Sequence, residues 1–425
     1  MKDIRIKPVK KFKGIIQIHS SKSLTIRALL IASMAIGNTK ILNFHYCEDV
    51  FYVLKALKKI GINFFLSKNK KICLILGKGN GPKCNSHKLF LGNSGLGVRL
   101  LISMLCINTN NVIVDSKKEM RKRPIFDLVN SLKKSGSKIK FLSKSKNLPI
   151  KIFGKCNGGK IEVNSSISSQ FLSSLLISLP LFPKRSYIIN KKITSSSYIK
   201  MTINLMKIFG VTVKNYKYKY FEILGRNKYT SPGNLILDGD ISNASYFLSA
   251  GAIKGKVRVY GINNLNTQGE TKFINYLENM GINVKYGLNY IECRKSKIKK
   301  VNINAKDIPD SSITLSILSL FSTENKVTLV KNTHVWKKKE SNRLLSVCNE
   351  LKKIGVKIKL KKNNLYIYPL DKLNRNISIN TYNDHRIAMC FSLISLFKVC
   401  VNIKNYICVN KTFPNFFKLF FKLCK

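Results

Sequence analysis

The sequence predicts an α/β protein of two domains, built from six copies of a βαβαββ-like unit with three copies in each domain. Three observations lead to this prediction. A polar segment followed by an apolar run recurs at a spacing of about 70 to 75 residues. Each run precedes a strand pattern and a second helix pattern. Most of the second helices then end at a glycine, after which another strand pattern begins.

The polar segments mark where the first helix of each copy would begin. In chain order they are Ser20–Ser23, Gly92–Gly95, Ser168–Gln170, Asp240–Ser242, Asp307–Asp310 and Asn383–Arg386. The runs that follow are rich in Ala, Ser, Leu and Ile, which predicts buried helices. The N-terminus of a helix carries free N–H groups and a partial positive charge, so it attracts anions. One such segment could be an N-cap and nothing more, but six in register favour a binding function.

The glycines close the second helices of the first five copies. A helix commonly ends with a residue at positive φ, which glycine adopts without steric cost. Strand patterns follow Gly61, Gly136, Gly210, Gly281 and Gly355. The second helix of the sixth copy is expected over residues 413–424, where the sequence stops before its glycine.

Composition excludes several classes of protein. The chain has 425 residues, 44% of them hydrophobic, and contains no apolar run near the roughly 18 residues of a membrane span. The N-terminal residues lack the apolar stretch of a signal peptide, so we expect a cytoplasmic protein. The 11 cysteines are scattered without CxxC spacing and no HExxH occurs, so we expect reduced thiols and no metal.

Positive charge dominates, since 76 Lys and Arg against 20 Asp and Glu give a net charge of +56. Such a charge is typical of nucleic-acid-binding proteins. The lysines, however, run along the whole chain and accompany abundant Asn, Ile, Phe and Tyr, which also have AT-rich codons. A strongly AT-biased genome therefore explains the composition better than an RNA partner does. Any acidic metabolite would still be attracted.

The domain boundary is predicted from an interruption at Ser231–Gly233, between the third and fourth copies. We expect one domain over residues 20–239. The other would comprise residues 240–425 and residues 1–19, because a first strand from Ile4 onward precedes copy one. The crossovers near residues 20 and 240 would act as a hinge, and a ligand site is expected in the cleft between the domains.

Eight motifs together resemble those of a known family. They are Ser21–Ser23 with Arg27, Leu91–Gly95 with Arg99, Arg123–Pro124, Ser168–Leu172, Ile308–Asp310, Lys339–Leu344, Thr381–Arg386 and Lys411–Pro414. In this order and spacing, over residues 14 to 423, the chain resembles the EPSP synthases, the 3-phosphoshikimate 1-carboxyvinyltransferases. The segment Asn383–Arg386 followed by a small-residue helix is the most specific of these motifs.

The resemblance implies a two-domain inverse α/β barrel that closes over shikimate 3-phosphate and phosphoenolpyruvate. It implies transfer of the enolpyruvyl (carboxyvinyl) group to the 5-hydroxyl of shikimate 3-phosphate. This is a step of the shikimate pathway, which leads to chorismate and the aromatic amino acids. Both substrates are anions, which suits a set of helix N-termini and cations. No cofactor, membrane or specific nucleic acid is implied, and we expect a monomer.

The resemblance also assigns binding residues. Phosphoenolpyruvate would be held by Lys22, Gly95, Arg123, Gln170, Arg343, Arg386 and Lys411. Shikimate 3-phosphate would contact Lys22, Ser23, Arg27, Ser168, Ser169, Gln170, Ser195, Tyr198, Asp310 and Lys339. Two of these have structural alternatives, since Tyr198 could be core packing and Arg27 a solvated helix residue. The fourth copy supplies no candidate.

The resemblance also implies catalytic roles. Asp310 is the expected base for the 5-hydroxyl, and Glu340 is the expected proton donor to the methylene carbon of phosphoenolpyruvate. Lys22 and Lys411 would stabilise the charge of the phosphate and of the intermediate. His385 and Asn93 would support this network. Two acids in one cationic site titrate together, so which carboxylate performs which step stays open.

Four residues depart from the family pattern. Val335 stands where the family usually has an asparagine that contacts shikimate 3-phosphate, and Asn342 replaces a usual aspartate. Leu96 and Leu100 replace a usual threonine and proline. We expect the bulky Leu96 to push Gly95 toward phosphoenolpyruvate and so to weaken binding of glyphosate, which competes with that substrate.

Two alternative functions stay open at this point. The enolpyruvyltransferase that acts on UDP-N-acetylglucosamine has the same architecture, but it commonly uses a loop cysteine in the second repeat. The segment from Ile107 to Lys155 contains no cysteine. An RNA-handling protein similar to RNA 3′-phosphate cyclase would need a histidine nucleophile and a nucleotide site, and the sequence offers neither.

Overall fold

The structure is a computed structural model that describes residues 2–193, 196–262, 270–337, 339–374 and 376–425. The chain divides into two compact units. Unit 1 consists of Met1–His19 and Asp238–Lys425, and unit 2 consists of Ser20–Leu237. Each unit has its own hydrophobic core. Each is described by itself below.

Unit 2 contains the first three copies. The first copy has β14 (Asn234–Ile236), α1 (Lys22–Met34), β3 (Asn38–Leu42), α2 (Glu48–Lys59), β4 (Phe64–Leu66) and β5 (Cys73–Leu76). The second has β6 (Asn85–Phe90), α3 (Gly95–Leu105), β7 (Asn111–Asp115), α4 (Lys118–Arg121), α5 (Phe126–Lys134), β8 (Ile139–Phe141) and β9 (Ile150–Ile152). The third has β10 (Gly159–Ser165), α6 (Ser169–Ser178), the 3₁₀ turn η1 (Leu179–Leu181), β11 (Ser186–Ile193), α7 (Ser196–Ile208), β12 (Lys214–Tyr216) and β13 (Tyr220–Ile223).

Unit 1 contains the other three copies. The fourth has β2 (Phe12–Gln17), α8 (Ile241–Lys254), β15 (Gly255–Tyr260), α9 (Lys272–Asn279), β16 (Asn283–Gly287) and β17 (Tyr290–Arg294). The fifth has β18 (Ile303–Asn304), α10 (Ser312–Leu318), η2 (Ser319–Phe321), β19 (Thr328–Lys331), η3 (Thr333–Trp336), α11 (Arg343–Lys353), β20 (Ile358–Lys361) and β21 (Asn364–Ile367). The sixth has β22 (Asn376–Ile379), α12 (His385–Phe391), η4 (Ser392–Phe397), β23 (Cys400–Ile403), η5 (Tyr406–Lys411), α13 (Phe416–Leu423) and β1 (Ile4–Ile6).

The sheets repeat one topology. In the sheet β10-β11-β13-β12 the first two strands are parallel and the others antiparallel, and the first, second, fourth and fifth copies have the same order. The first and fourth copies take their first strand from a distant part of the chain, since β14 pairs with β3 and β2 pairs with β15. In the sixth copy the sheet has three strands, and β1 pairs antiparallel with β23 in the place that β13 takes beside β11. The segment from Ile4 to Gln17 therefore belongs to unit 1.

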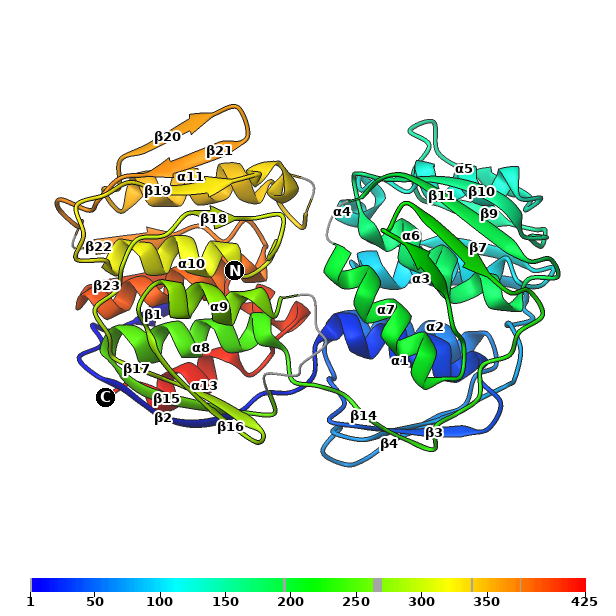
Figure 1. The fold of residues 1–425 in the computed structure, drawn as a ribbon, viewed down its shortest axis with the longest axis horizontal. Helices are drawn as coiled ribbons and strands as arrows, with labels where there is room; N and C mark the ends of the chain where they lie inside the picture. The colour runs from blue at the N-terminus through cyan, green and yellow to red at the C-terminus, as the bar shows by residue number, and fades with distance from the viewer. Residues whose placement is uncertain (1, 194–195, 263–269, 338, 375) are drawn as a thin grey trace. The chain divides into compact units, whose positions relative to one another are not determined.

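The first helices are buried, as the sequence predicts. Every described residue of α3, α10 and α12 is buried, as is α1 from Leu24 onward. Figure 1 shows this arrangement in unit 1, where β20 and β21 lie at the top, β2 and β16 lie at the bottom, and α8 and α10 lie between them. The small polar residues of these helices bond one another inside the core. The Oγ atoms of Ser103 and Ser174 lie 2.6 Å apart, between α3 and α6.

The five predicted glycine caps are confirmed. Their φ angles are all positive, at +80° for Gly61, +101° for Gly136, +81° for Gly210, +75° for Gly281 and +95° for Gly355. After each glycine, the next N–H reaches back to a helix carbonyl. In the second helix of the first copy, for example, the N–H of Ile62 donates to the carbonyl of Leu57 at 3.0 Å. This bond pattern is that of a Schellman cap, which is how the sequence ends each second helix.

The predicted helix starts are confirmed in five copies. The helices α1, α3, α6, α8 and α12 begin within or directly after their polar segments. In the fifth copy α10 begins at Ser312, with Ser311 as its N-cap, so the helix starts two residues after the end of the polar segment Asp307–Asp310. The main-chain N–H groups of Asp310 and Ser311 donate to the Glu270 side chain, so this segment forms a turn ahead of the helix.

The thiols agree with the expectation of reduced cysteines. All 11 cysteines are free, and eight of them are buried. Within the described ranges, no helix has both the length and the apolar character needed to cross a membrane.

Candidate active site

Arg343 lies at the centre of a buried ion cluster in unit 1. Its guanidinium Nε lies 2.8 Å from Asp384 Oδ2, its Nη1 lies 2.8 Å from Asp310 Oδ1, and its Nη2 lies 2.7 Å from Glu340 Oε2. The side chain is 1% exposed. Arg343 is the first residue of α11, and Asn342 caps that helix by accepting the N–H of Leu345. The structure thus brings together the predicted residues Asp310, Glu340 and Arg343.

Arg386 is joined to the same cluster through Asp310. Its Nη2 lies 3.3 Å from Asp310 Oδ2, and its Nη1 donates to the hydroxyl of Tyr246 at 2.8 Å. The main-chain N–H of Arg386 donates to Asp384, which caps α12. Lys339 Nζ approaches the other side of Asp310, at 3.7 Å from Oδ1. Two arginines and a lysine therefore surround one carboxylate.

The surrounding charges decide the ionisation of Asp310. Burial by itself favours the neutral acid and raises its pKa. The charges of Lys339, Arg386 and Arg343 outweigh that effect and hold the pKa of Asp310 well below its usual range. Asp310 is therefore ionised at neutral pH.

Two further predicted residues of unit 1 are buried near the helix starts. His385 is the first residue of α12, and its Nδ1 lies 3.7 Å from Asp384 Oδ1. Lys411 is the last residue of η5 and is 6% exposed. Val335, a departure from the family pattern, packs against the core of unit 1.

Lys22 is the first residue of α1 in unit 2. Its Nζ lies 2.8 Å from Asp49 Oδ2, in the first turn of α2. The Lys22 side chain is 16% exposed and Asp49 is 2% exposed. The helix is capped by Ser21, which accepts the N–H of Leu24. Ser23, which lies one helical turn before Arg27, is half-buried.

Arg27 is part of the core of unit 2, so the alternative of a solvated helix residue is wrong. It is 1% exposed, and its guanidinium donates to Thr202 Oγ1 at 2.8 Å and to Ser173 Oγ at 3.1 Å. A third bond reaches the carbonyl of Ser23 at 3.0 Å. In the described part of the chain it forms no ion pair. Burial lowers the pKa of Arg27 to about 10. A buried cation held only by hydroxyls and a carbonyl is suited to an anionic ligand.

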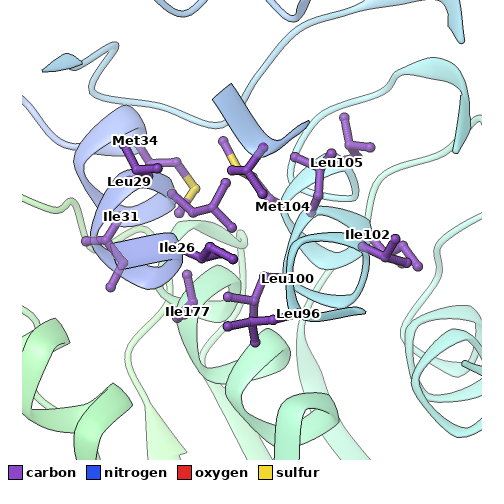
Figure 2. Close-up of a cluster of buried hydrophobic side chains, with 14 of the residues drawn as sticks. Ile26, Leu29, Ile31, Met34, Leu96, Leu100, Ile102, Met104, Leu105 and Ile177 are labelled. Carbon is purple, nitrogen blue, oxygen red and sulfur yellow. The ribbon is translucent and has the colours of Figure 1, made fainter. Parts of the chain in front are cut away.

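Arg123 lies against Gly95 in unit 2. A methyl group at Gly95 would stand 2.6 Å from Arg123 Nη1, so a larger residue here would displace the guanidinium from its present position. Leu96, the next residue, is 4% exposed and points into the core together with Leu100 (Figure 2). The two leucines therefore belong to the packing behind the helix start.

Arg99 connects the second and third copies. Its Nη1 donates to Gln170 Oε1 at 2.6 Å, and its Nη2 donates to the carbonyl of Pro124 at 2.8 Å. Ser168 caps α6 and accepts the N–H of Gln170, and Ser169 is buried. The predicted residue Gln170 is thus oriented by an arginine for which the sequence suggested no role.

The remaining predicted residues of unit 2 are less informative. Asn93 is half-buried in the turn before α3, and Tyr198 in α7 packs against the core while half-buried. Ser195 lies outside the described residues.

Several residues of these clusters were not assigned a role from the sequence. They are Asp49, Tyr246, Glu270 and Asp384, together with Asp240, which caps α8. Tyr246 comes from the fourth copy, for which the sequence offered no candidate. Four of the five are acids, in a chain with only 20 Asp and Glu. Because acidic residues are so scarce in this sequence, each one could have been considered as a candidate partner for a functional cation.

A family model described as EPSP synthase (3-phosphoshikimate 1-carboxyvinyltransferase) matches residues 6–420. The chain belongs to the EPSP synthase family. Two relatives named 3-phosphoshikimate 1-carboxyvinyltransferase are similar over almost their whole length. That of Buchnera aphidicola subsp. Cinara cedri is 42% identical, over 99% of this chain and 97% of its own. That of Escherichia coli (strain SMS-3-5 / SECEC) is 38% identical, over 98% of each.

Solved structures agree on the fold. EPSP synthase from Acinetobacter baumannii superposes with a TM-score of 0.83 at 24% identity, over 99% of this chain and 98% of that one. The enolpyruvyl transferase NikO from Streptomyces tendae gives a TM-score of 0.79 at 12% identity, over 99% and 97%. The predicted mixed α/β fold is confirmed by these two structures.

Family membership confirms the predicted activity class. EPSP synthases are 3-phosphoshikimate 1-carboxyvinyltransferases, which are transferases of the shikimate pathway and of aromatic amino acid biosynthesis. The EPSP synthase match is favoured over the two alternatives, the UDP-N-acetylglucosamine enzyme and the RNA 3′-phosphate cyclase-like protein.

Proposed function

We propose that this chain moves the enolpyruvyl group of phosphoenolpyruvate to the 5-hydroxyl of shikimate 3-phosphate and releases phosphate. The observation that carries the assignment of roles is the buried cluster of unit 1. There, two candidate acid–base carboxylates, Asp310 and Glu340, share the guanidinium of Arg343. Proton transfer needs titratable groups, and this cluster places them together with cations that bind anions.

Phosphoenolpyruvate is proposed to bind mainly to arginine and lysine side chains. Arginines suit its carboxylate and phosphate because a guanidinium can donate two parallel hydrogen bonds, while lysines act as point charges. The assigned residues are Lys22, the main chain at Gly95, Arg123, Gln170, Arg343, Arg386 and Lys411. The contact between Arg123 and Gly95 supports this set, because it places a guanidinium beside the N–H groups at the start of α3.

Shikimate 3-phosphate is proposed to bind through hydroxyls, cations and one carboxylate. The assigned residues are Lys22, Ser23, Arg27, Ser168, Ser169, Gln170, Ser195, Tyr198, Asp310 and Lys339. Arg27 supports this set most strongly, since a buried arginine held by neutral groups gains most from a substrate anion. Asp310 would accept the hydrogen of a ring hydroxyl.

Substrate binding is proposed to activate Asp310. In the described cluster its negative charge is balanced by Lys339, Arg386 and Arg343. When Arg343 and Arg386 turn to phosphoenolpyruvate, the pKa of Asp310 rises, because the cations that lower it now face a second anion. The carboxylate then accepts the proton of the 5-hydroxyl as the oxygen attacks the adjacent carbon. Glu340 would deliver a proton to the methylene carbon and recover it from the resulting methyl group as phosphate leaves. The proton held by Asp310 would pass to the departing phosphate, which returns Asp310 to its ionised form.

Lysines and two supporting residues complete the proposed mechanism. Lys22 and Lys411 would stabilise the phosphate and the charge of the tetrahedral intermediate. The Lys22 charge is already oriented by Asp49. His385, which lies beside Asp384, and Asn93 would support the network.

A cytoplasmic location is proposed on the state of the thiols. All 11 cysteines are free, including the three that are partly exposed, as is usual in a reducing compartment. Fractionation of cells followed by immunodetection would test this proposal.

One assay tests the function. Purified protein should release phosphate from phosphoenolpyruvate only when shikimate 3-phosphate is added, and Lys22→Ala or Asp310→Ala should abolish the release. Lys117→Ala is the matched control, because Lys117 pairs with Glu48 at 2.8 Å in the same unit and has no assigned role. Release driven by UDP-N-acetylglucosamine would contradict the proposal.

A further inference from the structure

We propose that Glu270 is a positioning residue that fixes the proposed base, Asp310, through its main chain. Glu270 precedes α9 and is 2% exposed. Its Oε1 accepts the N–H of Asp310 at 3.2 Å, and its Oε2 accepts the N–H of Ser311 at 3.0 Å. The hydroxyl of Ser311 donates to the same Oε2. One carboxylate therefore takes three donors from two consecutive residues.

Glu270 bonds the main chain of Asp310, whereas the cations that the substrates would attract bond its side chain. The Asp310 side chain is held by Arg343, Arg386 and Lys339, and each of these is a proposed substrate-binding cation. As those cations turn to the substrate anions, they release the side chain that is to accept a proton. The bonds from Glu270 persist through this exchange, so the carboxylate changes partners without losing its position.

Glu270 occupies a place that is unfavourable for an ionised carboxylate. Burial and the negative charge of Asp310 both raise the pKa of Glu270, and the hydrogen bonds from Ser311 together with the charge of Arg386 only partly oppose this. A plain helix cap needs no second carboxylate in such a place. Ser21 and Ser168 cap α1 and α6 with their own side chains. At α10 the N-cap Ser311 makes no such bond, and its hydroxyl faces Glu270 instead.

Glu270→Gln tests the proposal, because it keeps the size of the side chain but leaves one acceptor oxygen for three donors. The inference rests on the proposed role of Asp310, so Asp310→Asn and the double variant are measured beside it. We expect kcat of Glu270→Gln to fall about 10-fold to 100-fold, the range for losing a hydrogen bond to a charged group. KM for both substrates should change less than about threefold.

Glu292→Gln is the matched control for losing a buried carboxylate. Glu292 belongs to β17 of the same unit, is fully buried and pairs with Arg258 and Arg294 at 2.9 and 2.8 Å. This control should lower the melting temperature and leave kcat unchanged. Glu270→Asp keeps the charge with a shorter reach, and its kcat should lie between those of the wild type and Glu270→Gln.

The double variant separates positioning from general support. If Glu270 acts through Asp310, Glu270→Gln adds no further loss to Asp310→Asn. Additive losses, a wild-type kcat for Glu270→Gln, or an effect confined to KM would each overturn the inference. If Glu270→Gln does not fold, Glu270→Asp provides the same cycle, and it should lower kcat only while Asp310 is present.

The role of Asp310 as base and the role of Glu270 in positioning it can be tested separately. A wild-type kcat for Asp310→Asn would overturn the base assignment, and the inference about Glu270 with it. A slow Asp310→Asn beside an unimpaired Glu270→Gln would overturn the inference alone.

Discussion

The two units organise their charged candidates differently. In unit 1, Arg343 and Arg386 both pair with the carboxylate of Asp310, and Arg343 pairs with Asp384 as well. In unit 2, Lys22 also pairs with a carboxylate, that of Asp49, but the buried arginines bond neutral groups. Arg27 is held by hydroxyls and a carbonyl, and Arg99 by an amide and a carbonyl oxygen. Titratable acids suit proton transfer, whereas cations with neutral partners suit anion binding. This contrast suggests that proton transfer depends mainly on residues of unit 1 and that residues of unit 2 mainly bind the substrate anions.

The largest effect is expected from removing the central cation of unit 1. Arg343→Met leaves the buried Asp384 and the partly buried Glu340 without their guanidinium partner. Breaking such a cluster costs about 3–5 kcal/mol, so urea unfolding should show a loss of that size. Arg185→Met is the control, because Arg185 pairs with Glu222 at the surface and its loss should leave the stability almost unchanged. A similar small loss for Arg343→Met would show that the cluster is not a stabilising unit.

The acid dependence of stability should identify Asp310 as part of that cluster. Its pKa in the folded protein is held below the usual range, so the ionised group stabilises the fold at all pH values above the unfolded pKa of about 3.9. This contribution is lost as pH falls from there through the folded value. Asp310→Asn should therefore be less stable than the wild type at pH 7 by about 1–3 kcal/mol.

The same comparison made in acid provides the check on Asp310. The gap between wild type and Asp310→Asn, measured by denaturant titration, should narrow steadily below pH 4. A gap that stays constant from pH 7 to pH 3 would contradict the assigned ionisation.

Arg27→Met should reveal the contrasting behaviour of unit 2. The variant gives up a cation that has no carboxylate partner among the described residues, so its stability should change little compared with Arg343→Met. Binding of shikimate 3-phosphate should weaken about 10-fold to 100-fold, the equivalent of one charge-assisted hydrogen bond or two. Calorimetric titration measures this affinity. A stability loss as large as that of Arg343→Met would remove the distinction between the units.

Gly95→Ala should alter binding in unit 2 without unfolding it. The added methyl group meets the far end of the Arg123 side chain, which can move aside. We expect KM for phosphoenolpyruvate to rise about tenfold with kcat nearly unchanged, because a displaced guanidinium weakens ground-state binding. Steady-state kinetics with saturating shikimate 3-phosphate tests this. An unchanged KM would separate Arg123 from the phosphoenolpyruvate site.

The smallest effect is expected at Leu96. Its side chain is buried in the core of unit 2, beside Leu100, and it supports the backbone at Gly95 (Figure 2). Leu96→Thr should tighten inhibition by glyphosate a few-fold by relaxing that backbone. Inhibition curves at fixed phosphoenolpyruvate measure the change. Equal inhibition of both proteins would contradict an influence of Leu96 on the helix start.

The sequence determined those features whose cause is local. Gly61 and its four counterparts end helices because glycine adopts positive φ angles at no steric cost. The regular spacing of these glycines along the chain was therefore enough to predict the repeat. The apolar runs predicted the buried helices for the same kind of reason. The motifs that contain Asp310, Arg343 and Arg386 were found because each functional residue stands beside a helix start.

Tertiary structure decided which of these residues meet. The strands β2 and β14 pair with partners far along the chain, and no local pattern specifies such an exchange. Likewise, Glu270 reaches Asp310, and Asp49 reaches Lys22, only after distant segments have packed. Arg27 was ambiguous in the sequence because burial is a property of the packed core, which lies beyond one helix. Local propensities predicted where each group stands, while long-range packing decided what it contacts and therefore its charge state.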